Sequence, residues 1–114
     1  SQNHLVVEGA GGLLVPLNRK ATILDLMVQL DCEVILVSRH YLGSINHTLM
    51  SIELLKQKGL SIKGILFNGA ENKDTESIIS DMTGITVLGR IEDLEELSKE
   101  VITSIAQDLK TKLI

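Results

Sequence analysis

Apolar residues follow two alternating patterns along this chain. Short continuous runs are typical of strands buried on both faces of a sheet, whereas apolar residues recurring every three or four positions are typical of one side of a helix. The expected strands are Leu5–Val7, Val34–Val37, Ile62–Phe67 and Ile85–Leu88. The expected helices are Thr22–Leu30, Ser44–Lys58, Thr75–Met82 and Leu94–Leu113.

Alternating strands and helices predict an α/β fold, a mostly parallel sheet with flanking helices. Residue types at the expected helix ends agree with this order. We expect Ser44 to cap the second helix, and Gly59 and Gly84 to end the second and third. The acidic run at positions 92–96 is expected to open the last helix, because negative charge is favourable at a helix N-terminus.

Composition narrows the classes of protein and partner. A chain of 114 residues favours one domain, and 11 Lys and Arg against 15 Asp and Glu argue against a nucleic-acid or anionic membrane partner. No apolar stretch approaches the roughly 18–20 residues of a membrane span. The single cysteine, Cys32, excludes an intrachain disulfide and favours a reducing, cytoplasmic location.

Ligands of open parallel sheets bind at the carboxyl ends of the strands, so these ends were the first candidates for chemistry. The first expected strand ends at Glu8, followed by Gly9, Ala10, Gly11 and a further glycine. A carboxylate at a strand end can hold Mg²⁺ at a nucleotide site, and glycines let backbone N–H groups approach anionic oxygens. The alternative is a flexible turn beside a solvated carboxylate.

The next two strand ends offer different groups. After Val37 the chain enters a helix whose N-terminal N–H groups favour a carboxylate, with Asn46 and His47 in its first turn; the alternative is an ordinary capped surface helix. Asn68 offers both donors and an acceptor, which suits an adenine edge, although it could equally be a turn residue. His47 lacks a second ligand at metal-binding spacing, and acidic neighbours make Cys32 a poor nucleophile.

Taken together, these segments resemble four signature blocks of the dethiobiotin synthetases, in family order and at family spacing. The blocks are Leu5–Leu17, Val34–Val37 with Tyr41–Leu49, Gly64–Asn68 and Leu88–Ile91. The resemblance covers nearly the whole chain. It implies a P-loop NTPase-like fold, of which residues 1–114 would be the C-terminal part of a single domain.

The resemblance also implies a reaction. In this family the ureido ring of dethiobiotin is formed from 7,8-diaminononanoate, CO₂ (or bicarbonate) and MgATP. A homodimer is implied as well, in which the helix after the second strand serves the partner's active site.

Carried over residue by residue, the resemblance assigns three groups of positions. Glu8 would be the metal-site carboxylate, with Mg²⁺ as the metal. The nucleotide-binding residues would be Glu8, Gly9, Ala10, Gly11, Asn68, Ile91, Glu92 and Asp93. The residues presenting the helix start to the substrate's carboxylate would be Leu42, Gly43, Ile45 and Asn46.

Two features depart from the family pattern. Glu92 stands where the family usually has proline. The chain also has no Gly-x-x-x-x-Gly-Lys-Ser/Thr loop, so no catalytic residue is assigned to it, and the expected lysines would lie in a preceding N-terminal half. This chain alone would then be inactive. The alternatives are a related P-loop amide ligase of the cobyrinic acid synthase type and a non-catalytic module that has kept the fold.

Overall fold

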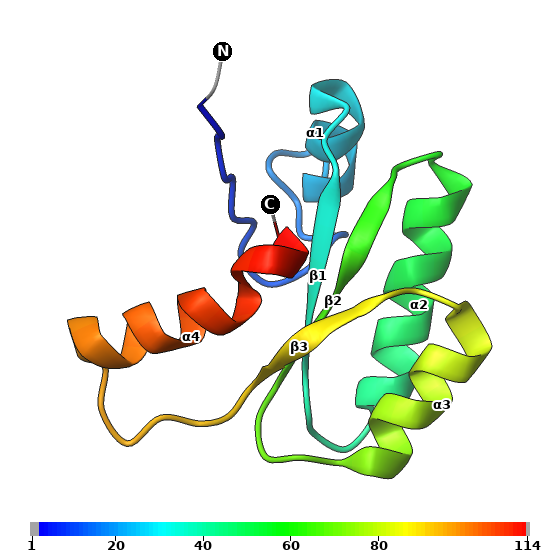
Figure 1. The fold of residues 1–114 in the computed structure, drawn as a ribbon. Helices are drawn as coiled ribbons and strands as arrows, with labels where there is room; N and C mark the ends of the chain where they lie inside the picture. The colour runs from blue at the N-terminus through cyan, green and yellow to red at the C-terminus, as the bar shows by residue number, and fades with distance from the viewer. Residues whose placement is uncertain (1–2, 114) are drawn as a thin grey trace. The chain divides into compact units, whose positions relative to one another are not determined.

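The computed structural model describes residues 3–113, and the chain divides into two units, residues 1–32 and 33–114. Each unit is considered by itself. The second unit holds the sheet and most of the helices (Figure 1). Among residues 3–113, no helix has the length and apolar character needed to cross a membrane.

The first unit is organised around a short helix, α1 (Ile23–Leu30). Thr22 and Asp25 form a capping box at its start, in which each side chain accepts a hydrogen bond from the other residue's backbone N–H. The preceding loop is joined to the helix start by backbone hydrogen bonds, including one of 2.8 Å from the Leu24 N–H to the Leu13 carbonyl. These local bonds account for the expected helix at Thr22–Leu30.

The expected strand at Leu5–Val7 is absent. These residues lie in an irregular segment, and their side chains are 89%, 88% and 61% exposed. A strand needs a neighbour to pair with its backbone N–H and C=O groups. Among residues 3–113 this segment is not paired with any strand, so its apolar run alone does not make it a strand.

The second unit contains a three-stranded parallel sheet in the order β1 (Val34–Arg39), β2 (Ile62–Asn68) and β3 (Val87–Ile91). The register places the last residue of each strand beside that of its neighbour, Arg39 opposite Asn68 and Asn68 opposite Ile91. This confirms the parallel arrangement. The third strand begins and ends further along the chain than the expected Ile85–Leu88, because its pairing with the end of β2 extends it to Ile91.

Three helices accompany the sheet: α2 (Ser44–Gln57), α3 (Lys73–Thr83) and α4 (Lys99–Leu113). Helices α2 and α3 lie side by side on one face (Figure 1). Their buried side chains join those of β2 in a core of Ile52, Ile65, Phe67 and Ile79. The expected flanking helices are therefore confirmed for this face.

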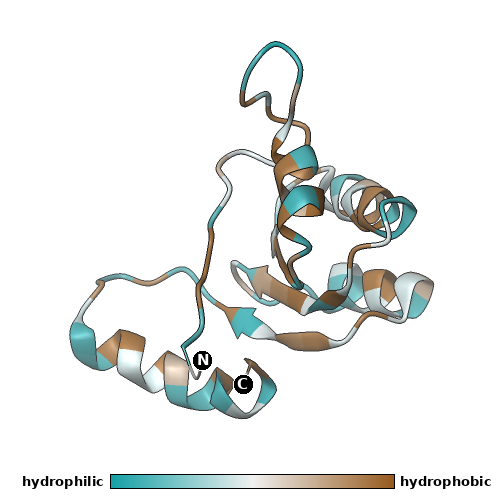
Figure 2. Cartoon of the chain, turned by 90° about the horizontal axis from the view of Figure 1, so that it is seen from above, coloured by the Kyte–Doolittle hydropathy of each residue, from teal (hydrophilic) through white to brown (hydrophobic). Residues whose placement is uncertain are grey.

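Helix α4 packs against β3 through one side only. Val101, Ile105 and Leu109 are partly buried at helical spacing while the residues between them are exposed, and hydrophobic and hydrophilic stretches alternate along α4 in Figure 2. The contact with the sheet is close at Gly89, where an added Cβ would lie 2.8 Å from Cδ2 of Leu109. The α4 contact therefore depends on the absence of a side chain there.

Two expectations about helix starts were wrong. Gly43, with a φ of 95°, is the N-cap of α2, and Ser44 is instead its first, buried residue. Helix α4 begins at Lys99 rather than Leu94, with the Ser98 hydroxyl accepting from the Val101 N–H at 3.2 Å. The acidic run at 92–96 lies in a loop, because its first residues make contacts with the strand ends instead.

The expectation that both faces of the strand are buried was also wrong for β1. Val34 and Ser38 on one face are buried, but Ile35 and Val37 on the other are 40% and 63% exposed. Ser38 faces α2, where its hydroxyl lies 2.7 Å from that of Thr48. An apolar run therefore predicted the strand correctly, but it did not show which of its faces is covered.

Candidate nucleotide site

The candidate site lies at the carboxyl edge of the sheet, where three strand ends meet. Asn68 ends β2 between Arg39 of β1 and Ile91 of β3. The Asn68 Nδ2 group donates to the Ile91 carbonyl at 2.9 Å, and its Oδ1 accepts from Nη1 of Arg39 at 2.8 Å. The same Nη1 lies 3.2 Å from Oδ1 of Asp93. Asn68 is thus held between the two neighbouring strand ends.

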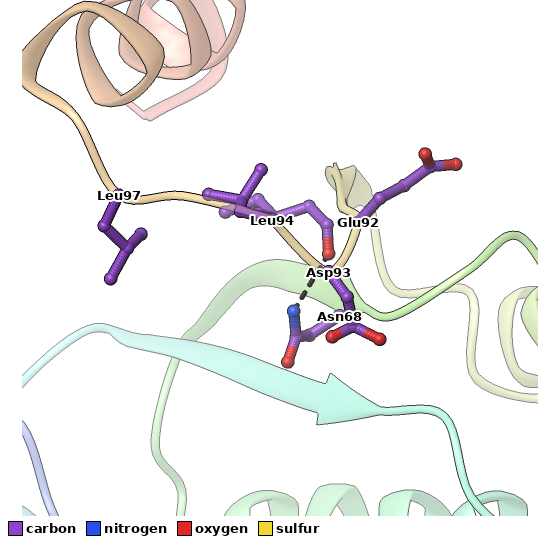
Figure 3. A pocket seen from close by; sticks show the side chains of 6 residues that line it. Asn68, Glu92, Asp93, Leu94 and Leu97 are labelled. Carbon is purple, nitrogen blue, oxygen red and sulfur yellow. Dashed lines mark hydrogen bonds between the residues drawn. The ribbon is translucent and has the colours of Figure 1, made fainter.

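A shallow pocket of about 340 Å³ opens beside Asn68. Figure 3 shows the Asn68 amide at one side and the leucines along the loop after β3, with the bond to the Ile91 carbonyl dashed. The residues that line the pocket are Asn68, Ile91, Glu92, Asp93, Leu94 and Leu97. An amide beside apolar side chains can hydrogen-bond the edge of a flat heterocycle while its faces contact hydrocarbon.

This pocket brings together four residues that the family resemblance assigned to nucleotide binding: Asn68, Ile91, Glu92 and Asp93. It also contains two leucines that sequence reasoning placed in a helix, Leu94 and Leu97. Their exposed fractions, 39% and 78%, indicate apolar surface available to a ligand. Arg39 was missed altogether, although a charged residue ending an apolar strand was the signal that could have found it.

A network of ion pairs lies next to this edge of the sheet and links the segments around it. Glu76 of α3 lies 2.9 Å from His40 Nε2 and 3.0 Å from Arg90 Nε, and both of its partners are largely buried. Burial raises the pKa of Glu76, but the hydrogen bonds that its carboxylate accepts from a backbone N–H, His40 and Arg90 lower it more. The pKa of Glu76 therefore lies below its ordinary value, which favours the charged form.

Glu92 belongs to this network. Its carboxylate lies 3.4 Å from Nη1 of Arg90, whose guanidinium also contacts Glu71 and Glu76. In Figure 3 the Glu92 side chain is directed away from Asn68. Glu92 thus pairs with Arg90, and its carboxylate is not directed at the Asn68 amide.

The loop from β1 to α2 carries the residues assigned to the substrate carboxylate. Leu42 at its tip is fully exposed, Gly43 begins the helix, and Ile45 and Asn46 lie exposed in the first turn. The loop starts beside the candidate site, because the His40 N–H donates to the Asn68 carbonyl at 2.9 Å. The helix N-terminus is therefore tethered to the same sheet edge.

Two aromatic side chains, Tyr41 and His47, contact each other within this loop and the helix that follows. The Tyr41 hydroxyl is hydrogen-bonded to Nδ1 of His47, with the ring centroids 5.6 Å apart. His47 is thereby engaged within its own loop and helix, which agrees with a structural use of this residue.

Glu8 and its glycines belong to the first unit. Glu8 and Gly9–Gly11 are exposed, and Gly11 has a φ of 88°, in the left-handed region that favours glycine. The Glu8 carboxylate is accessible, as a metal or phosphate site would require. Within residues 3–113 no cluster of three or more His, Cys, Asp or Glu side chains could hold a metal, so Glu8 would need oxygen ligands from other sources.

Comparison with known proteins gives the chain a family. The family model described as "AAA domain" matches residues 1–101. Proteins named ATP-dependent dethiobiotin synthetase BioD are similar over most of the chain. Identity is 50% over 107 residues with the protein of Cytophaga hutchinsonii, covering 94% of this chain and 52% of that protein.

Two further proteins of that name match the chain with similar identity and coverage. The Christiangramia forsetii protein is 49% identical over 113 residues, 99% of this chain and 54% of its own. The Nitrobacter hamburgensis protein is 47% identical over 98 residues, 86% of this chain and 46% of its own. The chain spans about half the length of the curated relatives it matches. It therefore belongs to the AAA domain family, and its sequence is similar to about half of a dethiobiotin synthetase.

Proposed function

We propose that this chain is the C-terminal part of an ATP-dependent dethiobiotin synthetase. The enzyme would close the ureido ring of dethiobiotin from 7,8-diaminononanoate, CO₂ and ATP. The observation that carries the proposal is 50% identity, over 94% of this chain, with a protein of that name. The names of the relatives favour this activity over an amide ligase or a non-catalytic module.

The proposed reaction divides into three steps. One amine of the diamine attacks CO₂ and loses a proton to give a carbamate. A carbamate oxygen then takes the γ-phosphoryl group of ATP, releasing ADP and forming a mixed carbonic–phosphoric anhydride. Finally the second amine attacks the carbonyl carbon and loses a proton, and phosphate leaves as the ring closes.

The pocket beside Asn68 is the proposed adenine site. Its support is geometric, since a hydrogen-bonding amide lies beside Leu94 and Leu97 at the carboxyl edge of a parallel sheet, where nucleotides bind in such folds. The backbone from Ile91 to Asp93 would flank the base. The proposed adenine site is thus built from the ends of β2 and β3.

We place the phosphate groups near Glu8 and the turn of Gly9, Ala10 and Gly11. The exposed Glu8 carboxylate fits a Mg²⁺ ligand because Mg²⁺ prefers oxygen, and the bound ion would neutralise phosphate charge. The phosphate-binding loop and the catalytic lysines, which this chain does not contain, would come from the other half of the enzyme.

The start of α2 is the proposed site of the substrate's carboxylate. Leu42, Gly43, Ile45 and Asn46 surround a helix N-terminus whose N-cap has no side-chain hydrogen bond. The N–H groups of a first helical turn and the helix dipole favour an anion there. We further propose a cytoplasmic homodimer in which this helix serves the partner's active site, and light scattering of the intact enzyme would measure its oligomeric state.

The charge of Glu8 tests the metal site. In the intact enzyme, Glu8→Gln keeps the side-chain volume and removes the charge, so dethiobiotin formation should fall on the order of 10²-fold. Glu100→Gln, at an exposed position of α4, is the matched control and should leave turnover unchanged. Full activity of the Glu8 variant would remove this carboxylate from the site.

Asn46→Ala tests the carboxylate site separately. Its KM for 7,8-diaminononanoate should rise about tenfold, the size expected for losing a hydrogen bond to a charged group, while its KM for ATP stays unchanged. Equal increases in both constants would argue against the assignment of this helix start to the diamine substrate.

A further inference from the structure

The orientation of the Asn68 side-chain amide is fixed by two partners of opposite character. Arginine can only donate hydrogen bonds and a backbone carbonyl can only accept them. Since Nη1 of Arg39 lies 2.8 Å from one end of the amide and the Ile91 carbonyl 2.9 Å from the other, oxygen must face Arg39 and nitrogen must face Ile91. A flipped amide would bring two donors together on one side and two acceptors together on the other.

Arg39 is itself positioned by two interactions. As the last residue of β1 it lies directly beside Asn68 in the register of the sheet. Its Nη1 carries two N–H groups, one directed to Asn68 and one to Oδ1 of Asp93, 3.2 Å away. The Arg39 and Asp93 side chains are 59% and 66% exposed, so the guanidinium lies at the protein surface rather than in the core.

An amide fixed in this way offers a ligand a defined order of groups. Oδ1 retains a second lone pair, and Nδ2 retains a second N–H. A 6-aminopurine matches this order, because its amino group donates beside a ring nitrogen that accepts. A 6-oxopurine presents an oxygen where the amino group would be, so its oxygen would oppose the Asn68 oxygen.

We infer that Arg39 is a specificity-determining positioning residue, which selects 6-aminopurine over 6-oxopurine nucleotides by holding the Asn68 amide in one orientation. The inference rests on the proposed adenine site. Arg39 contributes little to folding in this role, because exposed ion pairs such as that with Asp93 stabilise a fold only weakly. Its effect should therefore be seen in selectivity rather than in stability.

The test compares ATP with inosine triphosphate, which differs at the 6-position. In the intact enzyme, Arg39→Met keeps the aliphatic stem and removes every donor. The ratio of kcat/KM for ATP to that for inosine triphosphate should fall about tenfold, the effect of losing one hydrogen bond to a charged group. Arg39→Lys, which can still donate, should restore most of the ratio. Lys110→Met, at an exposed position of α4, is the control and should leave the ratio unchanged.

Asn68→Ala separates this inference from the proposed function. If Asn68→Ala raises the KM for ATP but Arg39→Met lowers kcat/KM for both nucleotides equally, the role of Arg39 is overturned and the adenine site stands. If Asn68→Ala leaves the KM for ATP unchanged, the adenine site is wrong and the inference falls with it. Thermal unfolding of each variant checks that the substitution leaves the fold intact.

Discussion

Gly64 offers the sharpest test of the packing of the sheet. This residue is buried in β2, and a Cβ added there would lie 2.5 Å from Cγ of Leu88 and 2.7 Å from the Thr86 carbonyl oxygen. Ordinary contacts between carbon atoms are about 3.5–4.0 Å. The Thr86 oxygen accepts from the Ile65 N–H at 2.9 Å, so it cannot retreat without weakening the link between β2 and β3. The packing around Gly64 therefore leaves no space for one added methyl group.

We expect Gly64→Ala to lower the free energy of unfolding by about 2–3 kcal/mol, the upper part of the range for overpacked cores. Folded domains have only about 5–15 kcal/mol in total, so the change is large. It would be measured by guanidinium denaturation of the intact protein, followed by circular dichroism. A loss below about 0.5 kcal/mol, the size typical of surface substitutions, would refute the packing described for β2.

A double-mutant cycle shows whether Leu88 is the cause. Leu88→Ala alone should cost about 2–4 kcal/mol, because it leaves a cavity in the core. In the double variant the Gly64→Ala methyl group fills part of that cavity, so the combined loss should be about 1–2 kcal/mol smaller than the sum. Ile79→Ala, in the core on the α3 side, is the control and should be additive with Gly64→Ala. Additivity with Leu88→Ala as well would contradict the proposed clash.

Two further predictions concern polar groups. Because the pKa of Glu76 is lowered in the folded protein, its charge contributes stability above its ordinary pKa of 4.5, and this is lost as pH falls through the folded value. The difference in unfolding free energy between wild type and Glu76→Gln should be constant near neutral pH and shrink below about pH 4.5; a pH-independent difference would contradict the role of the network. Ser38→Ala leaves the buried Thr48 hydroxyl without its 2.7 Å partner and should cost about 1–3 kcal/mol by urea denaturation. Adding Thr48→Val should recover most of this loss, and no recovery would mean that the pair is not the cause.

The helices were the most predictable part of the fold. The ends of α2 and α3 fall close to the expected residues, and Gly59 and Gly84 adopt positive φ values after them. These signals are local, because a glycine in the left-handed conformation ends a helix by itself. The sequence also predicted the parallel sheet, since strands that alternate with helices leave few other arrangements.

The candidate pocket was only half predictable. Asn68 could be chosen because it ends an apolar run, and Ile91 with Asp93 because of the family resemblance. Arg39 also ends an apolar run, which marks it as a candidate, but its role could not be assigned from the sequence because its partners Asn68 and Asp93 lie 29 and 54 positions further along the chain. No local pattern brings such residues together.

The amino-acid sequence by itself thus determined the order of the elements from α1 onward, most helix ends in the second unit and the family. Only the tertiary structure decided that β1 has one exposed apolar face, that Leu94 and Leu97 line a pocket instead of a helix, and that Glu92 pairs with Arg90. The physical reason is the range of the interactions. Periodicity and capping act over a few residues, whereas burial and side-chain pairing depend on which distant strands the register places side by side.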